Sequence, residues 1–214
     1  MIYLQRDFDL HPASPATRDR FVALATDALV PAWTRFGARL VGAWFHHESW
    51  FSQITHVIEF PDLAAFDATR IAMRDDAAWC AAAKEIEQLA PRRNDTLLEP
   101  LGPIAPAVLQ TAIEAARTEP AGAHTFAILE VAAGAMERFT GMLAFAKDQL
   151  PIVAAWRPVA GNPDLVIDLW KGDIGRDGYQ PTNDRTNAFF EPLRAIAPRE
   201  RLVRLLPLPY SPLQ

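Results

Sequence analysis

The sequence predicts an α+β protein built from two tandem ferredoxin-like domains, each with the element order βαββαβ. The first reason is an internal repeat, because residues 90–101, APRRNDTLLEPL, align without a gap with residues 197–208, APRERLVRLLPL. The second reason is that strand and helix patterns follow in the same order in each half. We therefore expect two homologous domains, residues 1–106 and 107–214.

Two further pairs of segments support the duplication. LVGAW at 40–44 corresponds to IVAAW at 152–156, and VIEF at 57–60 corresponds to VIDL at 166–169. Both pairs occur in the same order in each half, so chance matching is a poor explanation for them.

The first domain begins with an alternating strand in which Ile2, Leu4 and Phe8 share one face. The helix that follows has Ser14 as its expected N-cap and Pro15 at its first position, where a missing N–H costs little. The elements expected in this domain are a strand at 2–10, a helix from 15, strands at 40–47 and 54–60, a long helical region at 62–89 and a strand at 95–101.

The second domain repeats this order with a shorter second helix. Its expected elements are a strand at 124–131, a helix at 133–148, strands at 152–157 and 164–170, a helix at 183–196 and a strand at 201–208. The Gly, Pro and Asn residues of 171–183 indicate an irregular loop before the last helix.

The composition is that of an ordinary globular protein, with 50% hydrophobic and 22% charged residues. A net charge of −5 argues against a nucleic-acid partner, and no apolar stretch is long enough to predict a membrane span or a signal peptide. The single cysteine, Cys80, cannot form an intrachain disulfide and favours a reducing, cytoplasmic location. We interpret Cys80 as a packing residue on a helix.

Several segments together resemble the NIPSNAP family. In chain order they are the opening MIYLQRDFDL, the strand LVGAWF, the strand-to-helix segment HVIEFPDLAAFDATR, the helix DDAAWCAA, and the closing segments LLEPLGP and LLPLPYSP. No single one of these motifs is specific, but their order and spacing are.

The resemblance implies a dimeric α/β-barrel fold. Here the two domains would form, within one chain, the barrel that single-domain relatives form as dimers, which makes the protein an intramolecular pseudo-dimer. The resemblance brings no defined activity or cofactor, so the cofactor stays open. A second copy of the chain remains an option as a partner.

Arg6 is the most informative single residue of the first strand. It alternates onto the same face as Leu4 and Phe8, where a guanidinium needs a carboxylate or an anionic ligand. Glu130 falls opposite Arg6 when the two first strands are aligned, and we expect it to be a ligand-binding residue like Arg6. We expect Arg6 to pair with Glu59, Asp168 or Glu130, or else to bind a ligand carboxylate or phosphate.

Two histidines are candidates for acid–base chemistry. A hairpin centred near residue 51 would place His46 directly across from His56, and Trp44 across from Ile58. The alternative is a pair of ordinary hydrogen-bonded histidines at a strand end. No third ligand has a suitable spacing, so we predict no metal site.

The tryptophans are interpreted mainly as packing residues. Trp44 and Trp156 match across the repeat and are also the candidates for lining a ligand cavity, whereas Trp33, Trp79 and Trp170 are expected only to pack.

Two functions fit the sequence. In the first, the protein binds a small apolar or aromatic acid in a barrel pocket lined by Arg6, Trp44, His46 and His56, with cofactor-free oxygenase or isomerase-like chemistry as an option. In the second, it is a non-catalytic binding or scaffold protein with a packed interior, in which Arg6 is satisfied by an internal acid.

Overall fold

The structure is a computed structural model that describes residues 1–47, 52–174 and 184–214, with only the backbone described from 184 to 189. The chain divides into two compact units. Unit 1 comprises Met1–Leu98 together with Leu206–Gln214, and unit 2 comprises Glu99–Leu205. Most of the loop expected at 171–183 lies outside the described residues.

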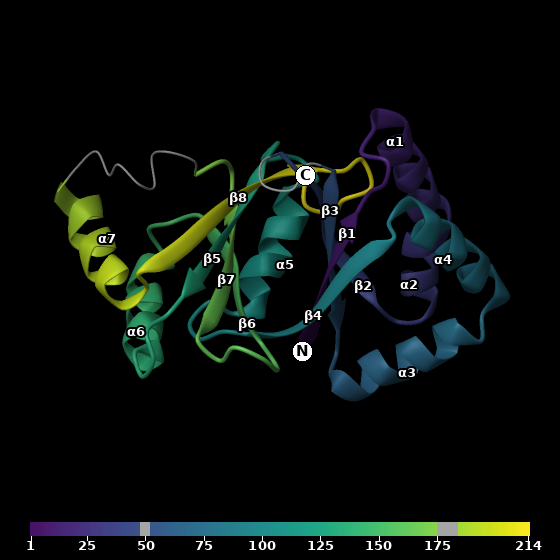
Figure 1. Ribbon diagram of the computed structural model, residues 1–214. Helices are drawn as coiled ribbons and strands as arrows, with labels where there is room; N and C mark the ends of the chain where they lie inside the picture. The colour runs from purple at the N-terminus through teal and green to yellow at the C-terminus, as the bar shows by residue number, and fades with distance from the viewer. Residues whose placement is uncertain (48–51, 175–183) are drawn as a thin grey trace. The chain divides into compact units, whose positions relative to one another are not determined.

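Unit 1 contains an antiparallel sheet in the order β4-β1-β3-β2, with its helices gathered on one side of the strands (Figure 1). Its elements are β1 (Ile2–Asp9), α1 (Pro15–Leu24), the π-helical turn η1 (Ala25–Leu29), α2 (Val30–Arg35), β2 (Arg39–His46), β3 (Gln53–Phe60), α3 (Leu63–Arg74), α4 (Ala77–Leu89) and β4 (Arg92–Pro100).

Unit 2 repeats the arrangement, with its strands in the order β8-β5-β7-β6. Its elements are α5 (Pro106–Ala115), β5 (His124–Glu130), α6 (Met136–Ala146), β6 (Ile152–Pro158), β7 (Leu165–Lys171), α7 (Asp184–Ile196) and β8 (Arg199–Pro207). Both sheets have the ferredoxin-like order, and the eight strands close into a barrel in the order β1-β3-β2-β8-β5-β7-β6-β4. The predicted fold class is confirmed.

The helical region expected at 62–89 is two helices, because Asp76 starts a second one. Asp62 caps α3 by accepting a hydrogen bond from the backbone N–H of Ala65, and Asp76 caps α4 by accepting one from Trp79. The helix α5 was not expected from the sequence. None of the helices in the described parts of the chain is long and apolar enough to cross a membrane.

Cys80 differs from its predicted role. It lies on the exposed face of α4, whereas the buried positions of this helix are Ala82 and Ile86. Cys80 is therefore a surface residue and not part of the packing.

The helix after β1 changes its winding before it reaches the sheet again. A π-helical turn at Ala25–Leu29 separates α1 from α2, and Pro31 follows within the first turn of α2. Proline has no N–H to donate and so favours such a local change of hydrogen bonding. Trp33 follows two residues later and is buried.

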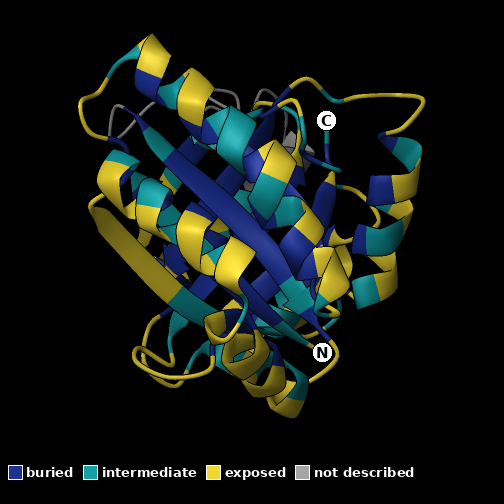
Figure 2. Cartoon of the chain, turned by 90° about the vertical axis from the view of Figure 1, so that its right-hand side faces the viewer, coloured by how far each residue is buried: buried dark blue, intermediate teal, exposed yellow. Residues whose placement is uncertain are grey.

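The two faces of the unit 1 sheet are set by its cross-strand register. Arg6 lies opposite His56, and His56 lies opposite Ala43, so these three side chains share one face. That face packs against the helices through Phe8, Phe21 and their apolar neighbours. Figure 2 shows mostly buried strands beneath helices whose outward faces are exposed.

The predicted pairing of His46 with His56 is wrong. His56 lies opposite Ala43, and Trp44 lies opposite Thr55. The hairpin register is shifted by three positions from the expected one, and an odd shift turns His46 to the other face of the sheet. A bulge between Leu40 and Gly42 adds a further irregularity to this pair of strands.

Candidate functional site

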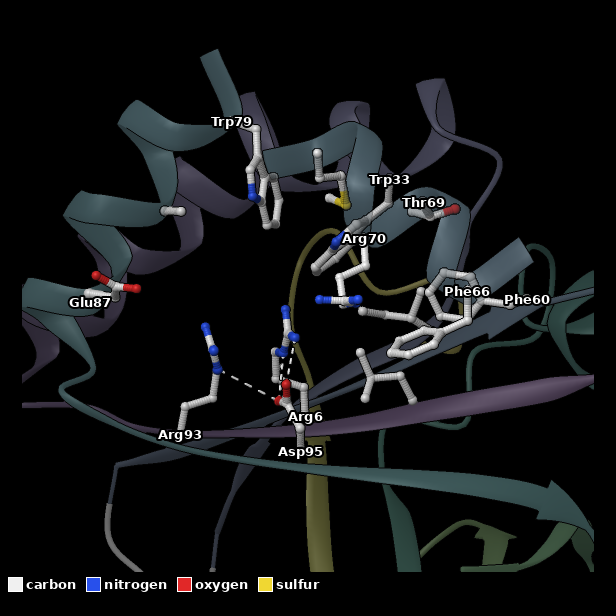
Figure 3. Close-up of a pocket in the computed structure, with 14 residues that line it drawn as sticks. Arg6, Trp33, Phe60, Phe66, Thr69, Arg70, Trp79, Glu87, Arg93 and Asp95 are labelled. Carbon is white, nitrogen blue, oxygen red and sulfur yellow. Dashed lines mark hydrogen bonds and ion pairs between the residues drawn. The ribbon is translucent and has the colours of Figure 1, made fainter. Parts of the chain in front are cut away.

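A cavity of unit 1 has a volume of about 290 Å³ and lies between the sheet and helices α2, α3 and α4 (Figure 3). Its walls are mainly apolar and aromatic. They are formed by Leu4, Trp33, Ile58, Phe60, Phe66, Met73 and Trp79. The charged residues at its edge are Arg6, Arg70, Glu87, Arg93 and Asp95. The side chains of Arg6, Arg93 and Asp95 rise from strands, and those of Trp79, Arg70 and Glu87 come from the facing helices.

Arg6 is held in place by Asp95 on the neighbouring strand β4. Its Nε and Nη2 atoms donate to Oδ1 and Oδ2 of Asp95, each at 2.7 Å. The two residues lie opposite each other in the β1–β4 register. This two-bonded geometry is the strongest form of an arginine–carboxylate pair, and the side chain of Arg6 is only 15% exposed. Arg6 is therefore satisfied by an internal acid and also forms part of the pocket wall.

The acid that pairs with Arg6 is none of the three expected ones. Glu59 accepts a hydrogen bond from Arg39 at 2.7 Å, and Glu130 accepts one from Arg199 at 3.2 Å. Asp168 belongs to the buried core of unit 2. Asp95 was missed because the strand was expected to begin only at residue 95, where the polar sequence indicates an exposed end, whereas β4 begins at Arg92.

Arg93 differs from the other arginines at the pocket. Its shortest ion-pair contact within the described residues is 3.7 Å, from its Nε to Oδ1 of Asp95, and it makes no hydrogen bond there. Arg70, in contrast, donates to Asp67 at 2.7 Å. The guanidinium of Arg93 is thus the group most available to an anion at this edge of the pocket.

His56 lies behind the pocket wall and is fully buried. Its Nε2 is 2.7 Å from the hydroxyl of Tyr210, and its ring packs edge-on against Phe8 and Trp33. Burial, helped by the positive charge of Arg6, lowers the pKa of His56 to about 3. His56 is consequently neutral at physiological pH and does not line the pocket.

His46 belongs to a separate polar chain on the other face of the sheet. Its Nε2 lies 2.7 Å from the hydroxyl of Thr55, which donates to Asp7 at 2.5 Å. Gln5 also donates to Asp7, at 3.2 Å. Burial raises the pKa of Asp7, and its hydrogen bonds with Thr55 and Gln5 oppose this shift.

The remaining candidates from the sequence do not line this pocket. Trp44 and Trp156 are almost completely buried, and Glu130 is exposed at the end of β5. Trp33 and Trp79, which were expected only to pack, form part of its aromatic wall. Their positions on α2 and α4 become relevant only once these helices are placed over the sheet.

The equivalent positions of the two units follow from their shared bulge. β2 has its irregularity between Leu40 and Gly42, and β6 has one between Ile152 and Ala154. Counting from these bulges, Trp44 corresponds to Trp156, as the sequence repeat predicts.

The same comparison corrects the expected match for Arg6. His56 corresponds to Asp168, and the residue opposite Asp168 is Ala127, so Arg6 corresponds to Ala127 and not to Glu130. Unit 2 thus has no arginine at this position.

The corresponding cavity of unit 2 is nearly closed, with a volume of about 20 Å³. Asp168 and Glu200 line it. Glu200 corresponds to Arg93, because Arg93 lies opposite Phe8 and Glu200 lies opposite Leu129, the residue of unit 2 that is equivalent to Phe8. Burial raises the pKa of Asp168 to about 8, and the charge of Glu200 contributes to the shift. The two corresponding cavities have therefore diverged: that of unit 1 is open and lined by arginines, and that of unit 2 is nearly closed and lined by two acids.

The strand order and the duplicated units define a dimeric α+β-barrel fold contained in one chain. Residues 3–102 match the sequence model of the NIPSNAP family, so the chain carries a NIPSNAP domain in its first half. The family resemblance expected from the sequence is confirmed over these residues. No curated protein sequence matches the chain.

Solved structures with the same fold carry several names. A provisionally assigned monooxygenase from Lactobacillus acidophilus NCFM superimposes with a TM-score of 0.63 at 11% identity, covering 96% of this chain and 93% of the other. An anthrone oxidase-like protein superimposes with a TM-score of 0.60 at 11% identity, covering 100% of this chain and 94% of the other. A chlorite dismutase from Candidatus Nitrospira defluvii superimposes with a TM-score of 0.52 at 9% identity, covering 97% of this chain and 91% of the other. At these identities the similarity shows the fold alone.

Proposed function

We propose that the unit 1 pocket binds a small carboxylic acid with an aromatic or apolar body. The observation that carries this proposal is the combination of an aromatic wall with one guanidinium, that of Arg93, that makes no hydrogen bond among the described residues. This site lies between the sheet and the helices of unit 1, on the face opposite to Trp44, and so replaces the pocket expected from the sequence.

The size and chemistry of the pocket support such a ligand. Its volume of about 290 Å³ is at the lower end for small-molecule sites. Trp33 and Trp79 lie with their ring centroids 6.4 Å apart and offer aromatic surface to a flat apolar body. A carboxylate can accept two hydrogen bonds from an arginine, and Arg93 lies at the polar edge of the same pocket.

The proposal is tested with 2-naphthoate as the probe, using isothermal titration calorimetry. We expect Arg93→Met to weaken binding about tenfold to a hundredfold, the loss that corresponds to one hydrogen-bonded charge pair. Arg92→Met is the matched control, because Arg92 is the adjacent exposed residue of β4 and points to the other face. It should bind the probe as the wild-type protein does.

The neutral analogue 2-naphthylmethanol separates the acid group from the apolar body. The wild-type protein should bind it more weakly than 2-naphthoate. The Arg93→Met variant should bind it as well as the wild-type protein does. Failure of the wild-type protein to bind 2-naphthoate at millimolar concentration, or equal weakening by both arginine variants, would falsify the proposal and favour the scaffold function.

Oxygenase or isomerase-like chemistry remains a prediction for the same pocket. Aerobic incubation with 2-naphthoate, followed by chromatographic separation and mass spectrometry, tests it, because an oxygenated product differs in mass and an isomer differs in retention. A product that appears with the wild-type protein and not with Arg93→Met supports catalysis. An unchanged probe that still binds supports a binding role.

Homodimer formation is tested by native mass spectrometry of the same samples, and the cytoplasmic location by fractionation of cells that express the protein.

A further inference from the structure

The end of β8 and the residues that follow it belong to unit 1 and are firmly attached to it. The backbone N–H of Leu208 donates to the carbonyl of Ala43 at 2.9 Å, and the N–H of Ala43 donates to the hydroxyl of Ser211 at 2.9 Å. Leu208 and Leu213 are buried. Residues 206–214, which we call the C-terminal segment, therefore pack as part of the unit that begins the chain.

Tyr210 of this segment reaches a buried histidine. Its hydroxyl lies 2.7 Å from Nε2 of His56, whose side chain has no exposed surface. The other ring nitrogen, Nδ1, has no hydrogen-bond partner within the part of the chain that the structure describes. Burial raises the pKa of Tyr210, so its hydroxyl stays protonated and can donate to the neutral imidazole. This hydroxyl is thus the polar contact that fixes the orientation of the ring.

The ring of His56 in turn supports the wall of the pocket. Its centroid lies 5.3 Å from that of Trp33, with an angle of 84° between the two planes. Phe8 and Phe21 pack against other parts of the imidazole, at 5.1 and 5.8 Å. Trp33 lines the pocket directly, on the side of α2. A rotation of the imidazole would therefore change the surface against which the Trp33 indole rests.

We infer that Tyr210 is a positioning residue for the unit 1 ligand site. Its hydroxyl holds the His56 ring in one orientation, and that ring holds the indole of Trp33 at the pocket wall. Tyr210 touches no ligand in this arrangement, so it acts through its two neighbours. The inference rests on the proposed function, since it assigns the C-terminal segment a part in binding the same acid.

The test is the variant Tyr210→Phe, which keeps the ring and removes the hydroxyl. We expect its affinity for 2-naphthoate to fall about threefold to tenfold, a loss comparable to that of one hydrogen bond. The ¹⁵N resonance of His56 Nε2 should shift in the same variant, because this nitrogen loses its partner. Tyr3→Phe is the matched control: it also removes a buried hydroxyl from unit 1, but Tyr3 lies on the other face of the sheet. It should leave both readouts unchanged.

The outcomes separate this inference from the proposed function. Binding by the wild-type protein with unchanged affinity in Tyr210→Phe overturns the inference alone, as does equal weakening by Tyr3→Phe. Absence of binding to the wild-type protein overturns the proposed function and the inference with it. If Tyr210→Phe does not fold, the test is made on the wild-type protein. Saturation with 2-naphthoate should shift the ring resonances of His56 and leave those of His46 unchanged. Unchanged His56 resonances would overturn the inference.

Discussion

Gly42 is the residue whose replacement the structure constrains most directly. A Cβ atom at this position would overlap the six-membered ring of Trp44, which is completely buried. We expect Gly42→Ala to lower the free energy of unfolding by about 1–3 kcal/mol through overpacking. Urea denaturation measures this loss.

Gly141→Ala is the control for this substitution. Gly141 lies in α6, where an added Cβ would meet no atom within 4 Å. This variant should be neutral or more stable by up to about 1 kcal/mol, since alanine favours the helix. Equal effects of the two substitutions would show that the Trp44 ring can move away from position 42.

Asp168 should give the protein a stability that falls as the pH rises. The pKa of its carboxyl is about 8 in the folded state, and an aspartate in the unfolded chain has a pKa of about 3.9. Between these values the native state keeps a proton that the unfolded state has lost. The contribution of Asp168 is therefore fully present below about pH 4 and is lost as the pH rises toward about 8.

The pH range from 7 to 8 is the range in which we expect to measure this effect. Burial lowers the pKa of His56 to about 3 and that of His124 to about 4, so both histidines are neutral in the folded and the unfolded states above about pH 7. We expect the free energy of unfolding to fall by up to about 1.4 kcal/mol between pH 7 and 8. Asp168→Asn should abolish this slope, and Asp164→Asn, on the loop before β7, should retain it. A slope that persists in Asp168→Asn would contradict the assignment.

Residue patterns predicted the need of Arg6 for a partner but not the partner itself. Alternation along β1 places Arg6 among apolar side chains, which demands a nearby negative charge. Asp95 supplies that charge only because β1 and β4 pair in one particular register. Such a register depends on the closed sheet, and a single sequence carries little information about it.

At the scale of secondary structure, the break between α3 and α4 positions part of the pocket. Asp76 accepts a hydrogen bond from the backbone N–H of Trp79 and another from Arg35, at 2.8 Å. Asp76→Ala should loosen the first turn of α4, which carries Trp79, and so weaken the binding of 2-naphthoate by less than Arg93→Met does. Calorimetry with Asp75→Ala as the control measures this, because Asp75 is the exposed neighbour at the end of α3 and its side chain does not cap α4. If both variants bind equally well, the cap has no part in placing Trp79.

Proline and aspartate residues predicted where helices of unit 1 begin and end, whereas the register of the β2–β3 hairpin was predicted wrongly. The β2 and β3 boundaries agree with the expected ones to within about one residue, but the pairing between them is shifted by three. Hairpin register depends on the loop conformation and on bulges, and each odd step exchanges the two faces of a strand. That is why His46 and His56, expected as a pair, lie on opposite faces.

At the scale of the whole chain, the repeat was sufficient to predict two ferredoxin-like sheets and their element order. It was insufficient to predict that their pockets differ. Matching VIEF with VIDL aligns Glu59 with Asp168, whereas the sheet registers align His56 with it. The residues that line the two cavities differ at equivalent positions: Arg6 and Arg93 of unit 1 correspond to Ala127 and Glu200 of unit 2.

The C-terminal segment should stabilise unit 1 more than unit 2. Removal of the C-terminal segment, residues 206–214, exposes the sites of Leu208 and Leu213, two buried side chains, and we expect a loss of at least about 3 kcal/mol in the free energy of unfolding. Hydrogen exchange should show faster exchange in β2 and β3 than in β5 and β7. Equal acceleration in both units would contradict this assignment, and Gln214→Ala serves as the control that leaves the two leucines in place.

The attachment of this segment also has a consequence for synthesis on the ribosome. The Met1–Leu98 part of unit 1 is translated before unit 2, yet Leu208, Tyr210 and Ser211 of the same unit are translated only after all of unit 2. Domains usually fold in the order in which they are made. Here the backbone of Ala43 and the ring of His56 lack their contacts with the C-terminal segment until unit 2 has been translated. Unit 1 therefore completes its contacts after unit 2, and its pocket is finished only once the second unit has been translated.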